Sequence, residues 1–257
     1  MINLIKAEIK KSGLKIPVIG LWLFILYFST ILIRKFEMTE TYADLFSKFY
    51  GIAPLCGLLM FIIYSGAYTK EYDSGMVSLI NTTKQGKKQI VKAKWIAHGI
   101  MTSITNLSIF GAIFISAASK FHFKGLDLPL KQLWYFGKSS SNMTILQLAI
   151  ITSITIILGS FLFAQIGLAL SANSKSAAVP FIVGAVIMGI PYIIQGFIPR
   201  GITKFLGFTP LWGMFYGQII RYKTPFTANI FLIVMFIAVM IILPKITYKA
   251  FTNENRK

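Results

Sequence analysis

One charged stretch of the sequence, KEYDSGMVSLINTTKQGKKQIVKAK, covers residues 70–94. It lies between two long apolar runs, Phe49–Ala67 and Trp95–Ala118, and it contains six lysines. Glu71 and Asp73 stand at its start, where negative charge favours the N-terminus of a helix. The stretch therefore predicts a short helix that begins directly after an apolar run.

The middle of this stretch predicts an amphipathic helix followed by a break. Gln85 and Gly86 interrupt the helical pattern, and a second helical start then leads into the next apolar run. We expect a helical elbow at a membrane surface, placed between two spanning helices. There it can transmit a movement of a soluble partner to the membrane-spanning helices. The apolar side of this elbow consists of Met76, Val77, Leu79 and Ile80.

The composition assigns the chain to the helical membrane proteins. Of its 257 residues, 55% are hydrophobic and 13% are charged, whereas a soluble domain carries about twice that charged fraction. Apolar runs of about 20 residues form helices that cross roughly 30 Å of hydrocarbon. We therefore expect an all-α integral membrane protein that forms a single domain over residues 1–257.

The net charge of +18 does not by itself indicate a nucleic-acid partner. Lys and Arg accumulate in the loops of membrane proteins, and no basic groove with interleaved aromatic residues accompanies the charge. Cys56 is the single cysteine, so the chain has no disulfide framework and no cysteine metal site. We expect Cys56 to be a small buried hydrophobic residue.

The apolar runs predict six transmembrane helices. Residues 1–11 form a basic amphipathic helix that lies in the membrane interface, and a short polar loop with Glu37, Glu40, Asp44 and Lys48 follows the first span. Six spans place both termini on one side, and the charged elbow and the basic N-terminal helix, more than a modest excess of basic residues, predict that this side is cytoplasmic. The expected spans are Leu14–Ile33, Phe49–Ala67, Trp95–Ala118, Met143–Leu170, Ala177–Phe197 and Ala228–Ile246.

The fifth span contains two prolines and two glycines. Pro180 and Pro191 remove backbone donors and predict a kinked helix. Together with Gly184 and Gly189 they suit either a gating motion or close packing of neighbouring helices, and the sequence leaves both open.

The chain shows no catalytic motif. Gly137-Lys138-Ser139 resembles the end of a phosphate-binding loop, but Gln132 occupies the position of the required first glycine. No acidic residue lies inside a span, which argues against proton-coupled transport. The sequence therefore predicts a protein that is not an enzyme and binds no metal.

The pattern Glu71-x-x-Ser74-Gly75, followed by Leu79, Lys87-Lys88 and Lys94, resembles the membrane subunits of type-2 ABC transporters, the ABC-2 permeases. The resemblance extends to the interfacial N-terminal helix, the six spans and the interrupted apolar segment before the last span. One departure is Met76, because Thr or Ser often follows the glycine in that family.

The resemblance implies a division of labour between two kinds of subunit. Residues 73–83 correspond to the coupling helix, which docks on a separate ATPase subunit through Met76, Leu79 and Ile80. ATP and magnesium are bound by that ATPase, and this chain binds no cofactor. The permease works as a homodimer or beside a different permease. The alternative is a charged inner loop, bound to anionic lipid headgroups.

The resemblance also assigns a role to the aromatic segment 205–216, which is too short to span a membrane. In the family, this position holds short helices that dip into the outer face as a re-entrant lid, represented here by Phe208, Pro210 and Trp212. The alternative is an aromatic belt at the interface, and both roles are compatible.

The cargo follows only from resemblance to permeases of low-GC Gram-positive bacteria. Those proteins export amphipathic cytolytic or antimicrobial peptides, as the phenol-soluble modulin exporters do, or confer immunity to lantibiotics. Drug or lipid efflux by the same machinery is the alternative. A non-transporting membrane sensor is a hypothesis of another class, and an ion channel fits worst because no filter-like segment is present.

Overall fold

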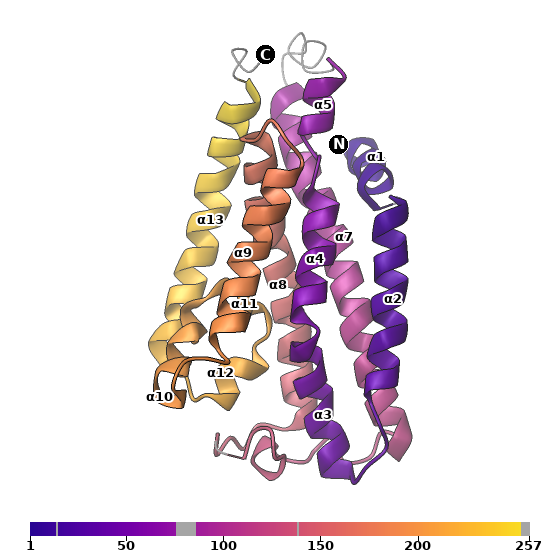
Figure 1. Cartoon of the computed structure of the whole chain (residues 1–257), viewed down its shortest axis with the longest axis vertical. Helices are drawn as coiled ribbons and strands as arrows, with labels where there is room; N and C mark the ends of the chain where they lie inside the picture. Colours follow the sequence, from indigo (N-terminus) through magenta and orange to yellow (C-terminus); the bar gives the residue numbers. More distant parts are fainter. Residues whose placement is uncertain (14, 76–85, 138, 253–257) are drawn as a thin grey trace.

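A computed structural model describes residues 1–257 except 14, 76–85, 138 and 253–257. The described part is all-helical, and an isolated bridge between Pro129 and Thr144 is its single β-type pairing. The helices form an elongated bundle with both chain termini at the same end (Figure 1). This end, which also carries α5, is called the terminal end below; the other is the far end.

The N-terminal helix α1 (Ile2–Gly13) lies across the terminal end of the bundle and meets α2 (Ile16–Leu32) at 74° (Figure 1). Pro17 stands in the first turn of α2, where its missing N–H has no helical partner to lose. The amphipathic helix expected for residues 1–11 is therefore present, and it packs against α7.

The prediction of a polar loop around Glu37–Lys48 is wrong, because this segment forms α3 (Met38–Gly51). The helix forms because its apolar residues follow the helical period. They bury one face while the charged residues occupy the other. α3 continues at an angle of 41° into α4 (Ala53–Tyr64), so the second crossing segment is a bent pair. The buried face of α3 includes Tyr42, Leu45, Phe46, Phe49 and Tyr50.

The centre of the bundle is α7 (Gly86–Ala118) packed against α8 (Ile145–Ala172). A small residue permits the close approach, because a Cβ on Gly99 of α7 would lie 2.4 Å from the ring of Phe161 on α8. On another side of α8, a Cβ on Gly167 would lie 2.4 Å from the ring of Tyr64 on α4. The loop between the two helices holds η1 (Ser119–Phe121) and η2 (Leu130–Gln132).

The last part of the chain runs through α9, a set of short helices and α13. α9 spans Ala178–Ile194 and packs on α4, and α13 (Phe226–Thr252) packs mainly on α8. Between them, a compact group of short helices fills the far half of the bundle (Figure 1). These are α10 (Arg200–Thr203), η3 (Lys204–Phe208), α11 (Pro210–Met214) and α12 (Gly217–Arg221).

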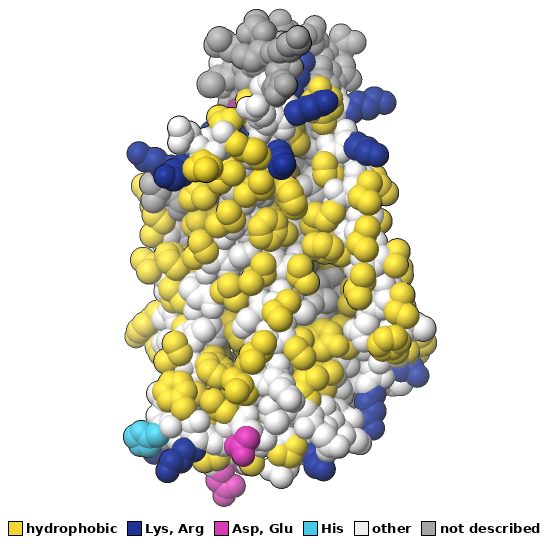
Figure 2. Space-filling model, turned by 180° about the vertical axis from the view of Figure 1, so that it is seen from behind, with side chains coloured by type: hydrophobic (Ala, Val, Ile, Leu, Met, Phe, Trp, Pro, Cys, Tyr) yellow, Lys and Arg dark blue, Asp and Glu magenta, His cyan; other side chains and the backbone are white. Residues whose placement is uncertain are grey.

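The structure is consistent with a membrane protein. Among the residues that the structure describes, three helices are long and apolar enough to cross a bilayer, and up to five segments qualify if the pairs α1–α2 and α3–α4 each count as one span. α9 has 17 residues and is shorter than a usual span. Hydrophobic side chains cover the middle of the bundle, and basic side chains gather towards both ends (Figure 2).

Candidate functional site

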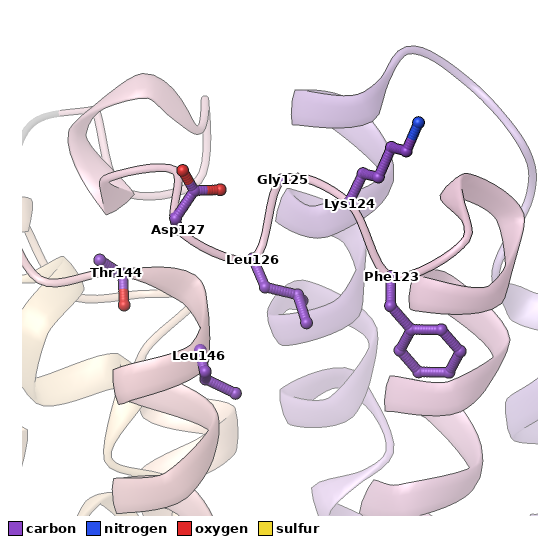
Figure 3. Close-up of a pocket in the computed structure, with 7 residues that line it drawn as sticks. All are labelled: Phe123, Lys124, Gly125, Leu126, Asp127, Thr144 and Leu146. Carbon is purple, nitrogen blue, oxygen red and sulfur yellow. The ribbon is translucent and has the colours of Figure 1, made fainter.

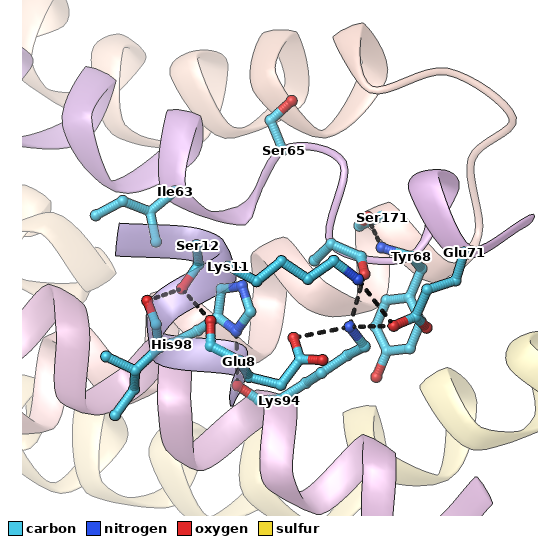
Figure 4. A network of polar contacts seen from close by, with 12 residues as sticks. Glu8, Lys11, Ser12, Ile63, Ser65, Tyr68, Glu71, Lys94, His98 and Ser171 are labelled. Carbon is cyan, nitrogen blue, oxygen red and sulfur yellow. Dashed lines mark hydrogen bonds and ion pairs between the residues drawn. The ribbon is translucent and has the colours of Figure 1, made fainter. Parts of the chain in front are cut away.

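A network of polar contacts where α5 meets α1 and α7, at the root of the elbow, is built around the ammonium group of Lys94. This group is completely buried. Its Nζ lies 2.7 Å from Oε1 of Glu71 and 2.9 Å from Oε2 of Glu8, and it donates a hydrogen bond of 2.9 Å to the carbonyl oxygen of Ala67. These groups come from α7, α5 (Thr69–Asp73), α1 and the turn after α4 (Figure 4). One lysine of α7 therefore joins α1 to the adjacent turn and helix that follow α4.

Two further lysines extend this network. Lys11 donates a hydrogen bond of 3.3 Å to Oε1 of Glu71, while Nζ of Lys15 donates to the carbonyl oxygens of Ile62, Ile63 and Ser65. The last carbonyls of a helix have no partners within the helix, so a cation at this position satisfies them. The junction between α1 and α2 is thereby attached to the end of α4.

The charges at the centre of the network balance: Lys11 and Lys94 carry two positive charges, and Glu8 and Glu71 carry two negative ones. Burying a charge is costly unless a partner of opposite sign and hydrogen bonds replace water. Oε2 of Glu71 is buried with no hydrogen-bond partner among the described residues, so this carboxylate depends on its contacts through Oε1. Removal of Lys94 would leave two carboxylates without their main partner.

Neighbouring side chains hold Lys94 in place. Its ammonium lies 5.2 Å from the centre of the Tyr68 ring, and the backbone N–H of Tyr68 donates to Oγ of Ser171 on α8. The Tyr68 ring also packs on Phe251 of α13 at 5.1 Å. Nδ1 of His98 lies 2.7 Å from the carbonyl oxygen of Lys94, one helical turn away. A change at this junction therefore reaches α8 and α13 as well.

The residues proposed for coupling have different environments. Glu71 is 5% exposed and lies inside the network, so its carboxylate offers no surface to a partner. Asp73 and Lys88 are exposed, and Lys87 is half-buried. Gly75 has a φ of +67°, a backbone conformation that glycine adopts without strain, and it ends the turn after α5.

The apolar contact residues expected on the elbow, Met76, Leu79 and Ile80, lie outside the described residues. The sequence reasoning also missed three members of the network, Glu8, Lys11 and Lys15. Glu8 is the one acidic residue among the first 36, placed in a helix that carries three lysines. An isolated carboxylate in a basic interfacial helix is a signal that could have identified it.

The expected lid forms a second polar cluster, in the far half of the bundle. Trp212 is completely buried, and its Nε1 donates a hydrogen bond of 3.2 Å to the hydroxyl of Tyr50. That hydroxyl donates to Oε1 of Gln195, whose Nε2 donates to the hydroxyl of Tyr222 at 3.0 Å. The cluster joins α3, the end of α9, α11 and the residue after α12. Trp212 thus lies inside the protein and does not face lipid.

A cation completes this cluster. The guanidinium of Arg221 lies 4.0 Å from the centre of the Tyr135 ring and 5.1 Å from that of Tyr222. Gln218 donates a hydrogen bond of 2.6 Å to the Tyr135 hydroxyl. Burial raises the pKa of Tyr135, although the charge of Arg221 opposes the shift. The phenol therefore stays neutral at physiological pH and acts as a fixed hydrogen-bonding group.

The other two lid residues are less buried. Phe208 is half-buried and packs against Phe231 of α13, with 5.5 Å between the ring centres. Pro210 stands in the first turn of α11, where proline is compatible with a helix. The three residues thus belong to one folded unit, of which Phe208 faces α13 and Trp212 faces α3.

We expect Trp212→Phe to lower the free energy of unfolding by about 1–2 kcal/mol, because the ring fills a buried site and its N–H is bonded to Tyr50. Trp134→Phe is the matched control: this ring is 58% exposed, so its replacement should change stability by less than about 0.5 kcal/mol. Thermal unfolding of the purified protein in detergent measures both. Equal effects of the two changes would contradict the buried position of Trp212.

The proline positions in α9 also differ from each other. Pro180 lies in the first turn, where a helix has no backbone bond for its N–H, and Pro191 lies in the interior of the helix. The helix continues through Pro191 to Ile194. Of the two prolines, only Pro191 therefore removes a backbone hydrogen bond from the helix.

A shallow hollow of about 480 Å³ lies between the loop at residues 123–127 and the start of α8 (Figure 3). Lys124 and Asp127 project from one side of the loop, and Leu126 points the other way (Figure 3). The first N–H groups of α8 are already bonded, because Ile145 and Leu146 donate to loop carbonyls and Gln147 donates to Thr144. The hollow offers no free helix donors to an anion.

Within the described residues, no group of three or more His, Cys, Asp or Glu side chains is arranged to hold a metal ion. Cys56 is buried and free, as expected from the sequence. No family model matches the chain, and no curated protein matches it. The two polar clusters and the exposed faces of the bundle are therefore the features that bear on function.

Proposed function

We propose that the chain is the membrane subunit of an ATP-driven exporter of the ABC-2 class, located in a bacterial cell membrane with both termini in the cytoplasm. In this arrangement six segments cross the membrane: α2, the pair α3–α4, α7, α8, α9 and α13. The short α9 crosses together with the residues up to 197. A separate subunit binds and hydrolyses ATP, and this chain forms the path along which the cargo crosses the membrane.

The observation that carries this proposal is the Lys94 network at the root of the elbow. A loop that merely binds lipid headgroups has no need of a buried lysine held by two carboxylates. Here the segment that leads into residues 76–85 is fixed to the interfacial helix α1, to α4 and to α7 by Glu71, Glu8 and Lys94. A displacement of the elbow is therefore passed to these helices as a unit.

The pair α3–α4 connects this network with the lid cluster. Lys15 binds carbonyls at one end of α4, and Tyr50 of α3, three residues before the start of α4, belongs to the hydrogen bonds around Trp212. When the ATPase subunits close and push the elbow, α4 tilts and the contacts of Tyr50 change. The lid then opens at the outer face. In this mechanism the buried polar groups transmit motion and take no part in chemistry.

A second copy of the permease completes the path. Helices α2 and α9 flank α4 on one face of the bundle (Figure 1), and each carries large exposed apolar side chains. Tyr27 on α2 is 70% exposed and Ile193 on α9 is 60% exposed. Two such faces enclose an apolar cavity between protomers, in a homodimer or with a different permease. An uncharged cavity suits amphipathic peptides, and drugs or lipids are the alternative cargo.

The test is affinity purification of the tagged chain from its native membrane, with partners identified by mass. We expect an ATPase subunit in equal number, and we expect the double change Leu79→Asp, Ile80→Asp to abolish its recovery while the permease still inserts. Lys175→Glu, in another loop at the terminal end, is the control and should retain the partner. If the chain is recovered alone under conditions that preserve other transporter complexes, the exporter proposal fails. The chain is then a sensor.

A further inference from the structure

We infer that the chain has a binding site for one membrane phospholipid, in a groove between α8, α11 and α13. The groove has a volume of about 430 Å³ and is lined mainly by apolar side chains, among them Leu158, Leu162, Met214 and Phe236. This volume falls within the range of roughly 300–1,000 Å³ that is typical of small-molecule sites. The groove lies apart from the Lys94 network and from the face formed by α2, α4 and α9.

The groove is walled on one side by short helices packed tightly on α8. A Cβ on Gly159 would lie 2.7 Å from Cβ of Met214, so α11 touches α8 where Gly159 leaves room. Gly213 approaches Leu232 of α13 in the same way, with 3.2 Å between its ideal Cβ and the leucine. These contacts fix the depth of the groove, and α8 and α13 are not closed over it.

The groove opens to the region that lipid would occupy. The hydrophobic part of α13 is only 6% buried within the protein, and at the groove Leu158 is 47% exposed and Ile233 is 60% exposed. In a bilayer, the molecules that reach such a surface are lipid acyl chains. An acyl chain fills a narrow apolar groove better than the irregular side of a protein helix does.

Two polar side chains in the groove indicate which lipid group lies there. Tyr216 and Asn229 both line it, and neither side chain has a hydrogen-bond partner among the described residues. An unpaired amide or phenol in an apolar setting is unfavourable, so these groups call for a ligand with a hydrogen-bond acceptor. The ester carbonyl of a diacyl phospholipid supplies that acceptor next to its acyl chain.

The position of Asn229 along α13 agrees with this assignment. α13 begins at Phe226, and a span needs about 20 residues, so Asn229 lies within one turn of the end of the hydrocarbon layer. Lipid esters lie at that level. The acyl chain then runs along α8 from Thr155 towards Leu162, and the headgroup lies beyond Phe226, near the exposed Lys223.

The inference needs the chain to be in a membrane and does not need it to be an exporter. It is tested with the full chain in vesicles of phosphatidylglycerol and phosphatidylcholine, which contain a phosphatidylglycerol with a photoactivatable diazirine in one acyl chain. We expect cross-links concentrated on residues of the groove when they are mapped by mass spectrometry. The corresponding diether phosphatidylglycerol, with the same diazirine, should label the groove less, because it lacks the ester carbonyls.

Two pairs of variants make the test specific. Leu158→Trp fills the groove and should remove most of the cross-linking there. Ile157→Trp, at the preceding position of α8, is the control and should not, because Ile157 is 39% exposed and does not line the groove. Asn229→Leu should lower groove labelling about fivefold, the change expected for one lost hydrogen bond, and the nearby Thr227→Val should leave it unchanged.

The inference is overturned if cross-links follow exposure evenly along α13, or if Asn229→Leu has no effect in a protein that elutes and unfolds like the unmodified chain. Equal or stronger labelling by the diether phospholipid would also overturn it. None of these results depends on an ATPase partner or on transport, so the lipid site and the exporter proposal can fail separately.

Discussion

Replacement of Lys94 by methionine is expected to lower the free energy of unfolding by about 3–5 kcal/mol. Lys94 is fully buried, and its loss leaves the carboxylates of Glu8 and Glu71 without the cation that compensates them. Methionine keeps the length and most of the volume of the side chain, so the effect is electrostatic. Unfolding in detergent, followed by circular dichroism, measures the change.

The control is Lys92→Met, two residues earlier on the same helix. Lys92 is exposed, so its replacement should change the free energy of unfolding by less than about 0.5 kcal/mol. If Lys92→Met and Lys94→Met had similar effects, the network would not be a stabilising unit. Under the exporter proposal the two variants should also differ in the partner assay, because the loss of Lys94 releases Glu71 of α5 from α1 and α7.

A double-mutant cycle distinguishes the ion pair from simple loss of packing. Glu71→Gln removes the charge that Lys94 balances, so Glu71→Gln with Lys94→Met should cost less than the sum of the single changes. A buried apolar or neutral pair is often no less stable than the ion pair it replaces. Additive effects would show that the two side chains act independently, against the 2.7 Å contact between them.

The second large effect is expected at Gly184, where even a methyl group has no room. A Cβ at this position would lie 2.0 Å from a ring carbon of Phe61, because α9 packs directly on α4 there. We expect Gly184→Ala to lower the free energy of unfolding by about 1–3 kcal/mol, the usual cost of overpacking a core. Thermal unfolding and the exposure of Cys56 to a membrane-permeant thiol reagent both report the loosened contact.

Gly189 provides the matched control on the same helix. No atom lies within 4 Å of its ideal Cβ, and its backbone is helical, so Gly189→Ala should be neutral or stabilising by up to about 1 kcal/mol. A loss of stability at Gly189 equal to that at Gly184 would contradict the packing. Under the exporter proposal, a Gly189→Ala variant that keeps the fold but impairs export would show that the flexibility of α9 matters for transport.

These two glycines show where sequence reasoning stops. Both lie in the same apolar run, and the run alone leaves gating and close packing open. The structure separates them, because Gly184 faces Phe61 and Gly189 faces open space. The two prolines are separated in the same way by their positions in α9, one in the first turn and one in the interior.

Local pattern predicted the helical class, the amphipathic helix α1 and the approximate positions of the apolar segments. It failed at α3, where charged residues at positions 37, 40, 44 and 48 suggested a loop. The helical spacing of Tyr42, Leu45, Phe46 and Phe49 was present in the same sequence, and burial of that face outweighed the charges opposite. Helix boundaries shifted for a similar reason at α13, which continues to Thr252.

What the sequence by itself determined is the part of this protein that depends on neighbours along the chain. Apolar runs of bilayer length, lysines at their ends and a charged elbow after the second run are all local. Only the tertiary structure decided which charges meet. Lys94 lies 86 residues from Glu8, and Trp212 lies 162 residues from Tyr50. Such pairs form because a buried polar group must find a partner wherever the packing of the helices brings one within reach, and sequence spacing does not encode that distance.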